Sequence, residues 1–188
     1  MAEVIVETAR LVLRRWRDHD FAPWLEHLNT PQVKAFLGGV QPLETMAERF
    51  AKLERAWDVA GYSFLAVERC EDRAFLGACG IGRIETASAP DGLRGEVEIG
   101  WQLRADCWGQ GYATEAARAV LAMAFERFAF PTVFAQTSEN NRASWRVMER
   151  LGMARRADLD YPDPDYPPQD NPTMVYALPR ADWEARQT

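Results

Sequence analysis

The chain has 188 residues, of which 47% are hydrophobic and 27% charged, and its formal net charge is −6. This length predicts a single domain, expected over residues 8–187, and the acidic balance argues against non-specific binding to nucleic acid or to an anionic membrane surface. Three cysteines without paired or metal-like spacing and two histidines on one early helical stretch predict neither a disulfide framework nor a metal site. We find no signal pattern and no apolar run of membrane-spanning length, and we therefore expect a cytoplasmic protein.

The N-terminal third is predicted to hold one strand and two helices. Apolar and basic residues alternate over 10–16, which predicts the strand. Residues 18–29 are expected to form a first helix capped by Asp18. Residues 42–60 carry an amphipathic pattern with a proline in the first turn, and Gly61 is expected to end this second helix.

Three further strands are predicted in the middle of the chain. Residues 62–68 and 74–84 favour a pair of antiparallel strands around a short turn. Bulging or close approach of the backbone is expected where the second of these strands carries Gly77, Gly80 and Gly82. After a polar loop, residues 96–103 alternate again and predict the third strand.

The C-terminal part continues the alternation of strands and helices. The elements predicted there are a helix at 112–128, a strand at 132–137, a helix at 141–151, a strand at 173–178 and a helical turn at 181–186. The proline-rich, acidic segment 157–172 excludes a helix and predicts a surface loop, which follows a strand near Ala154. This order indicates an α/β fold with helices on both faces of the sheet.

The stretch WGQGYATE at 108–115 places two glycines where a strand gives way to a helix. The first amide groups of a helix have no partner within the helix and the helix dipole is positive there, which favours an anion such as phosphate. A plain tight turn is the alternative. A Walker loop is excluded because Tyr112 and Ala113 follow Gly111, and a dinucleotide fingerprint because Thr114 occupies its third small position.

A second group of residues follows about thirty positions later, with Asn141, Ser144 and Gly152 in the stretch NRASWRVMERLGM at 141–153. Together with EIGWQL at 98–103 and WGQGYATEA at 108–116, it resembles the GNAT superfamily of N-acetyltransferases. The likeness is strongest to the ribosomal-protein-alanine acetyltransferase-like branch. It extends from RLVLRRW at 10–16 to YALPRADW at 176–183.

The resemblance implies the GNAT acyltransferase fold, a mixed and mostly antiparallel sheet. In that family the strands corresponding to 96–103 and 132–137 are parallel and splay apart, and acetyl-CoA enters the gap. The glycine turn holds its pyrophosphate, while the first of these strands and the later asparagine contact the pantetheine. The implied cofactor-binding residues are Trp101, Gln102, Leu103, Gly109, Gln110, Gly111, Tyr112, Ala113, Thr114 and Asn141.

Acetyl transfer from a thioester to an amine needs a base for the amine and benefits from an acid for the departing thiolate. We expect Glu98 to be the base, with Glu96 on the same strand face as the second candidate. Solvent-facing carboxylates on a half-exposed strand are the alternative interpretation. Many GNAT enzymes carry a tyrosine where this chain has Met148; the resemblance implies that Ser144 replaces it, as in the resembled branch, as the candidate acid. The alternative is that Ser144 satisfies backbone groups in the first helical turn or orients the cofactor.

The predicted function is acetyl-CoA-dependent acetylation of a primary amine, either a protein N-terminus or a small molecule. The alternative is a non-catalytic acyl-CoA-binding or regulatory module. Dimers are common among such enzymes, so a homodimer is also expected, with no nucleic-acid or membrane partner.

Overall fold

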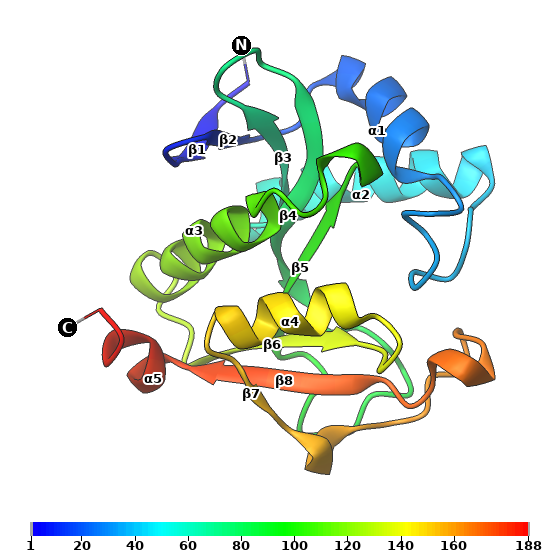
Figure 1. Ribbon diagram of the computed structural model, residues 1–188, viewed down its shortest axis with the longest axis vertical. Coiled ribbons are helices and arrows are strands. Elements are labelled where there is room, and N and C mark those ends of the chain that lie inside the picture. Colours follow the sequence, from blue (N-terminus) through cyan, green and yellow to red (C-terminus); the bar gives the residue numbers. More distant parts are fainter. Residues whose placement is uncertain (1, 188) are drawn as a thin grey trace.

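A computed structural model describes residues 2–187 of the protein (Figure 1). The strands are β1 (Val4–Glu7), β2 (Leu11–Arg14), β3 (Phe64–Arg69), β4 (Phe75–Arg83), β5 (Val97–Leu103), β6 (Thr132–Thr137), β7 (Ala154–Arg155) and β8 (Met174–Pro179). The helices are α1 (Phe21–Leu28), α2 (Leu43–Ala60), α3 (Tyr112–Glu126), α4 (Arg142–Arg150) and α5 (Arg180–Glu184).

All eight strands form one sheet in the order β1-β2-β3-β4-β5-β6-β8-β7. Neighbouring strands are antiparallel except β5 and β6, which are parallel. β5 pairs with β4 along its whole length, from Val97 to Leu103. Its pairing with β6 in this structure consists of Glu98 opposite Phe134. The strands therefore separate beyond Glu98, and the predicted splayed parallel pair is confirmed.

Helices cover both faces of the sheet, as predicted. The period-two alternation of a strand sends successive side chains to opposite faces. On β3, Leu65 and Val67 belong to the core cluster that contains the apolar face of α3, whereas Ala66 packs with Trp24 of α1 and Met46 of α2. α1 and α2 thus lie on one face of the N-terminal half of the sheet, and α3 lies on the other (Figure 1).

Close packing of the backbone explains two of the glycines on β4. A Cβ atom on Gly80 would lie 2.2 Å from the Cα atom of Phe64, and one on Gly77 would lie 2.2 Å from the carbonyl oxygen of Gln102. Real Cβ atoms do not approach other atoms so closely, so the predicted close approach is confirmed at both positions. At Gly82 the nearest atom is 3.6 Å away, which is ordinary contact.

The start of the first helix differs from the prediction. Asp18 opens a 3-10 turn and makes no side-chain capping hydrogen bond, and α1 begins three residues later at Phe21. Asp20 instead accepts a hydrogen bond from the backbone N–H of Arg17 at 2.7 Å. The carboxylate of Asp20 also forms a buried ion pair with Arg14 of β2. Local capping preferences do not include such a contact with a neighbouring strand.

Arg14 is the largest fully buried side chain of the protein's described part, with 1% of its surface exposed. Its guanidinium donates to Asp20 at 2.6 Å and to Glu68 at 2.5 Å. A buried guanidinium needs such partners because an unpaired charge in the interior is very costly. The two ion pairs join β2, β3 and the start of α1 beneath the N-terminal half of the sheet.

Two other segments also depart from the prediction. β1 was not expected, because a four-residue strand has little periodicity to detect; it pairs with β2 at the sheet edge. Within 157–172, every residue of which the structure describes, there is no α-helix, but two 3-10 turns occur. Tyr161, Asp163 and Asp170 are buried, so the segment packs against the sheet and is not a simple surface loop.

Candidate functional site

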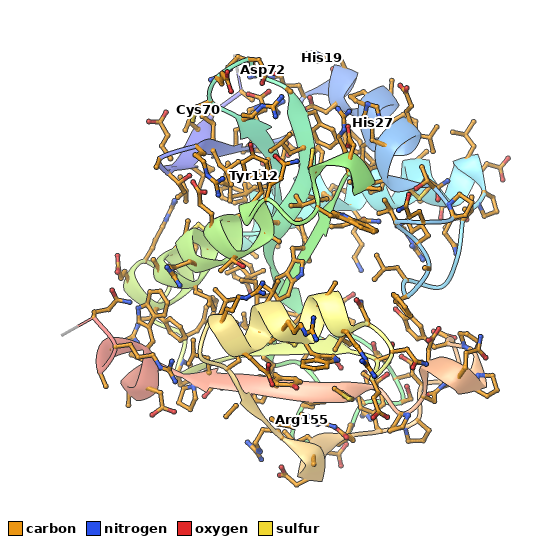
Figure 2. The ribbon with its side chains drawn as sticks, in the orientation of Figure 1. His19, His27, Cys70, Asp72, Tyr112 and Arg155 are labelled. Carbon is orange, nitrogen blue, oxygen red and sulfur yellow. The ribbon has the colours of Figure 1, made fainter. Side chains whose placement is uncertain are left out.

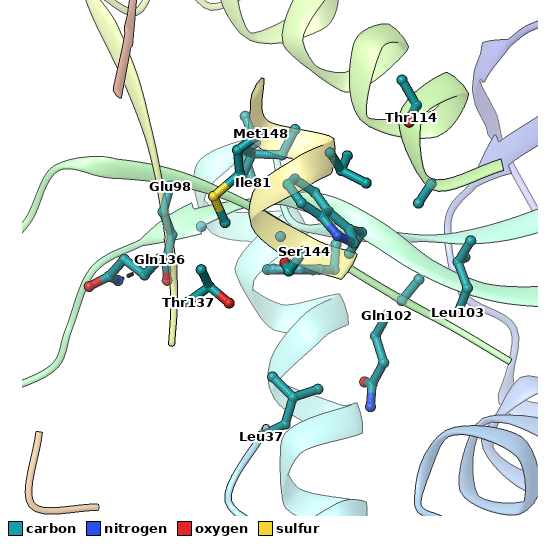
Figure 3. A pocket seen from close by; sticks show the side chains of 18 of the residues that line it. Leu37, Ile81, Glu98, Gln102, Leu103, Thr114, Gln136, Thr137, Ser144 and Met148 are labelled. Atoms are coloured by element: carbon teal, nitrogen blue, oxygen red, sulfur yellow. Dashed lines mark hydrogen bonds between the residues drawn. The ribbon is translucent and has the colours of Figure 1, made fainter. Parts of the chain in front are cut away.

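A large cleft of about 2160 Å³ opens beside the separated strands. Its walls come from β4 and β5, from α2, α3 and α4, and from the segment 157–172. Figure 3 shows Glu98 and Gln136 on one side of this space, with Ser144 and Met148 of α4 beside them and Leu37 opposite. The cleft lies where β5 leaves β6, so part of its wall is a strand edge without a neighbouring strand. Such an edge can pair with an extended ligand.

The predicted glycine turn lies at one end of the cleft and begins α3. Gly109 and Gly111 have φ angles of +74° and +82°, in the left-handed region that glycine adopts readily. Gly111 is the N-cap residue of α3 and provides no side-chain acceptor. Within the described chain, no acceptor is found for the backbone N–H groups of Tyr112, Ala113 and Thr114. These groups at a helix N-terminus form a site suited to an anion.

Residues from the N-terminus brace this turn. The carboxylate of Glu115 accepts hydrogen bonds from the Thr8 hydroxyl at 2.6 Å and from Nε of Arg10 at 2.7 Å. Burial opposes ionisation of Glu115, but these hydrogen bonds outweigh it and the pKa of Glu115 lies below its ordinary value. The Arg10 guanidinium also donates to the Gln110 carbonyl at 3.0 Å and lies 4.6 Å from the ring centre of Tyr112. The turn is therefore held by contacts about a hundred residues away in sequence.

Nearly all of the expected cofactor-binding residues line the cleft. They are Trp101, Gln102, Leu103, Gly109, Gly111, Tyr112, Ala113, Thr114 and Asn141. Gln110 does not line it: its side chain donates to the Asp106 carbonyl and its own carbonyl accepts from Arg10, and its contact with the cofactor stays a prediction. Asn141 caps α4 by accepting from the Ser144 backbone N–H at 3.3 Å. Its side-chain amide group makes no other hydrogen bond within residues 2–187.

Glu98 lies at the point where β5 and β6 pair, and its carboxylate lines the cleft. Gln136 of β6 donates to it at 2.7 Å, and the Tyr161 hydroxyl donates to the other end of the Gln136 amide at 2.6 Å. Burial raises the pKa of Glu98 and the Gln136 hydrogen bond lowers it; burial prevails, and the pKa lies above its ordinary value. Glu96 precedes β5 and does not line the cleft.

Ser144 and Met148 lie one helical turn apart on α4 and both line the cleft. Met148 is almost completely buried, and a thioether has no proton to donate. The Ser144 hydroxyl makes no hydrogen bond within the part of the chain that the structure describes, so it does not satisfy the first turn of α4. It is free to donate to a group bound in the cleft (Figure 3).

The model of the acetyltransferase (GNAT) domain matches residues 10–154, which include the glycine turn, Glu98 and Ser144. The chain belongs to the GNAT family. A relative, an uncharacterised protein of Bacillus subtilis strain 168, is 33% identical over 155 residues, which cover 81% of this chain and 86% of that one.

Solved structures of acetyltransferases have the same fold as this chain. The crystal structure of an acetyltransferase from Agrobacterium tumefaciens str. C58 is 30% identical, covers 92% of each chain and has a TM-score of 0.74. A ribosomal L7/L12 α-N-protein acetyltransferase in complex with coenzyme A shares the fold, with a TM-score of 0.74, 17% identity, and coverage of 96% of this chain and 99% of that one. The GNAT fold predicted for the chain is thereby confirmed.

Some residues of this GNAT site were not predicted from the sequence. Gln136 of β6 donates to Glu98, and Tyr161 of the segment 157–172 donates to Gln136. Thr8, Arg10 and Glu115 form the brace of the glycine turn. Each is an ordinary polar residue in its local sequence, and no spacing or composition signal distinguishes it. Their roles depend on which distant elements come together.

The side chains that bind metals most often are dispersed. His19 lies in the 3-10 turn before α1 and His27 lies in α1, apart from Cys70 at the turn after β3 (Figure 2). Among residues 2–187, no three His, Cys, Asp or Glu side chains gather in a way that would hold a metal ion. The described helices also lack the combination of length and apolarity needed to cross a membrane.

Proposed function

We propose that this GNAT domain transfers an acetyl group from acetyl-CoA directly to a primary amine, with Glu98 as the base. The observation that carries the proposal is the position of Glu98. Its carboxylate lines the cleft at the point where the parallel strands separate, and burial raises its pKa. A carboxylate tuned towards neutral pH is suited to accept a proton from an ammonium group, directly or through water.

The residues present fit acetyl-CoA. The unpaired N–H groups of Tyr112, Ala113 and Thr114 and the left-handed glycines offer a place for its pyrophosphate. The free edge of β5 at residues 101–103 offers hydrogen bonds to the extended pantetheine arm. The relative with the same fold that was solved with coenzyme A supports this assignment.

We assign the chain's side chains to the steps of a direct transfer. Glu98 takes a proton from the acceptor ammonium, so that the nitrogen lone pair can attack the thioester carbonyl. A backbone N–H of β5 between Trp101 and Leu103 stabilises the charge that develops on the carbonyl oxygen. As the new C–N bond replaces the C–S bond, the nitrogen releases its second proton to solvent and Ser144 donates its proton to the departing sulfur. Ser144 is then reprotonated from solvent, and Glu98 returns its proton to solvent. Its unengaged hydroxyl supports this role.

A non-catalytic acyl-CoA-binding module is the second candidate. It is favoured by Met148, which stands where many GNAT enzymes have a tyrosine and cannot donate a proton. The buried carboxylate of Glu98 favours catalysis, because a binding module has no need for an ionisable group of raised pKa in its cleft.

The two candidates are separated by measuring CoA release with a panel of primary amines, alongside calorimetric titration of acetyl-CoA. The panel should include peptides with free N-termini and small amines, because both acceptor classes fit the proposal. We expect acetyl-CoA to bind and at least one amine to be acetylated. Tight binding with no turnover on any amine would favour the module. The cytoplasmic location and the homodimer remain predictions.

A further inference from the structure

One lysine in the cleft is buried without a counter-ion. Lys34 lies in the turns between α1 and α2, is 4% exposed and lines the same cleft as Glu98. Within residues 2–187 its ammonium group makes no hydrogen bond and no ion pair. Its backbone is firmly held, since its N–H donates to Thr30 at 2.9 Å and its carbonyl accepts from Leu37 and Gly39 at 3.0 and 3.1 Å. The turn thus fixes the backbone from which the Lys34 side chain lines the cleft.

A second cation lines the same cleft but is exposed to solvent. Arg49 of α2 lines the cleft and, in the described chain, has no carboxylate partner. Burial, and to a smaller extent the charge of Arg49, lowers the pKa of Lys34 to about 8, so the ammonium form still prevails at neutral pH. Lys52, further along α2, differs because Glu85 pairs with it at 2.6 Å. Among residues 2–187, neither Lys34 nor Arg49 has an ion-pair partner.

Carboxylates line the same cleft as these cations. The Tyr166 hydroxyl is within electrostatic range of Arg49 and also of Glu98 and Asp163. Asp170, which is buried, lines the cleft as well. The cleft consequently carries acids, among them Glu98 and Asp170, together with two cations that have no ion-pair partner among the described residues. A buried charge without a partner is costly, and a ligand of opposite charge removes that cost.

We propose that the acceptor amine carries an anionic group, a carboxylate or a phosphate, which Lys34 and Arg49 bind while its amine faces Glu98. This inference rests on the proposed acetyltransferase function and narrows its substrate class. The anion site is separate from the backbone amides of α3, because Lys34 lies between α1 and α2 and Arg49 on α2 itself.

The test compares matched acceptor pairs in the CoA-release assay. The first kind of pair is an amino acid and its carboxamide, of which the amino acid carries the anionic carboxylate. The second is phosphoethanolamine, which carries the anionic phosphate, and ethanolamine. We expect wild-type kcat/KM to favour the anionic member of at least one pair by about tenfold or more, since charge-assisted hydrogen bonds to a buried cation are strong. The pair that shows the preference identifies carboxylate or phosphate as the anion.

Lys34→Gln should abolish this preference by raising KM for the anionic acceptor, and Lys34→Arg should restore part of it. Lys52→Gln is the matched control, because Lys52 is already paired, and it should leave the preference intact. Thermal melts of each variant verify that it is folded. Acetyl-CoA titration is expected to give the same Kd for wild type and Lys34→Gln.

Two results would overturn the inference while leaving the acetyltransferase function standing. The first is turnover of amines with no preference for the anionic member of either pair. The second is weaker acetyl-CoA binding in Lys34→Gln, which would assign Lys34 to the cofactor. If no amine is acetylated, the proposed function fails, and calorimetry with N-acetyl amino acids and with inorganic phosphate then tests the anion site alone. Equal binding of both ligands to wild type and Lys34→Gln, or none to either, would contradict it.

Discussion

Replacing Glu98 by glutamine tests the central chemical claim with the smallest change of shape. Glutamine keeps an oxygen that can accept from Gln136, so the 2.7 Å hydrogen bond has a replacement, but it cannot accept a proton from the acceptor amine. Removal of a general base typically costs about 10²- to 10⁴-fold in rate. We expect kcat to fall by this amount in Glu98→Gln, with the Kd of acetyl-CoA unchanged.

The effect on stability distinguishes a catalytic carboxylate from a structural one. Burial raises the folded-state pKa of Glu98, so the folded protein binds this proton more tightly than the unfolded chain does. The contribution of this group to stability is complete below its unfolded pKa and is lost as the pH rises through the folded pKa. At neutral pH, Glu98→Gln should therefore be at least as stable as the wild type in chemical denaturation.

Gln136→Leu should change the pH dependence without removing the base. The Gln136 amide stabilises the ionised carboxylate, and a hydrogen bond to a charged group is worth about 1.5–3 kcal/mol. Each 1.36 kcal/mol changes an ionisation equilibrium tenfold. At a fixed acidic pH the ionised fraction of Glu98 should fall about tenfold or more, so the acidic limb of kcat/KM moves to higher pH. Tyr161→Phe, which frees only the far end of the Gln136 amide, should move it less.

The assay is CoA release across the pH range, with the most active amine at saturating acetyl-CoA. An unmoved acidic limb in Gln136→Leu would refute the reasoning, and so would wild-type turnover in Glu98→Gln. Loss of stability in Glu98→Gln at neutral pH would indicate that the carboxylate serves the fold and not the reaction.

Three further predictions concern the protonation of the departing CoA sulfur, the glycine turn and the buried Arg14. Ser144→Ala should slow turnover by about a hundredfold with little change in acetyl-CoA affinity, and unchanged turnover would remove Ser144 from the mechanism. Gly111→Ala should cost about 1–2 kcal/mol of stability and weaken acetyl-CoA binding about tenfold in calorimetry. Gly95 has the same φ of +82° but lies outside the cleft, so Gly95→Ala should show the stability loss alone. Arg14→Met should reduce the free energy of unfolding by about 3–5 kcal/mol, because buried Asp20 loses its ion pair and Glu68 keeps only its longer contacts with Arg17 and Arg73. Lys52→Met at an exposed pair should cost at most about 1 kcal/mol in the same urea titration.

The sequence by itself determined the features that depend on near neighbours in the chain. A strand was predicted over 62–68, and the two-residue period of a strand explains why Leu65 and Ala66 pack in different clusters. Gly61 ends α2 with a φ of +74°, as its position after the apolar stripe predicts. The spacing of the motifs around Gly111 and Asn141 indicated the family. These signals are readable because backbone conformation and side-chain periodicity act over a few residues.

Only the tertiary structure decided which polar groups meet. Glu98 and Glu96 were both candidate bases from their alternation, and the cleft includes only Glu98. The hydrogen bond from Thr8 to Glu115 spans 107 residues, and Tyr161 reaches Gln136 from a segment expected to be a surface loop. Lys34 has nothing in its neighbouring sequence to mark it as a buried cation. Contacts of this kind depend on how distant elements pack on one sheet, and no local pattern encodes that arrangement.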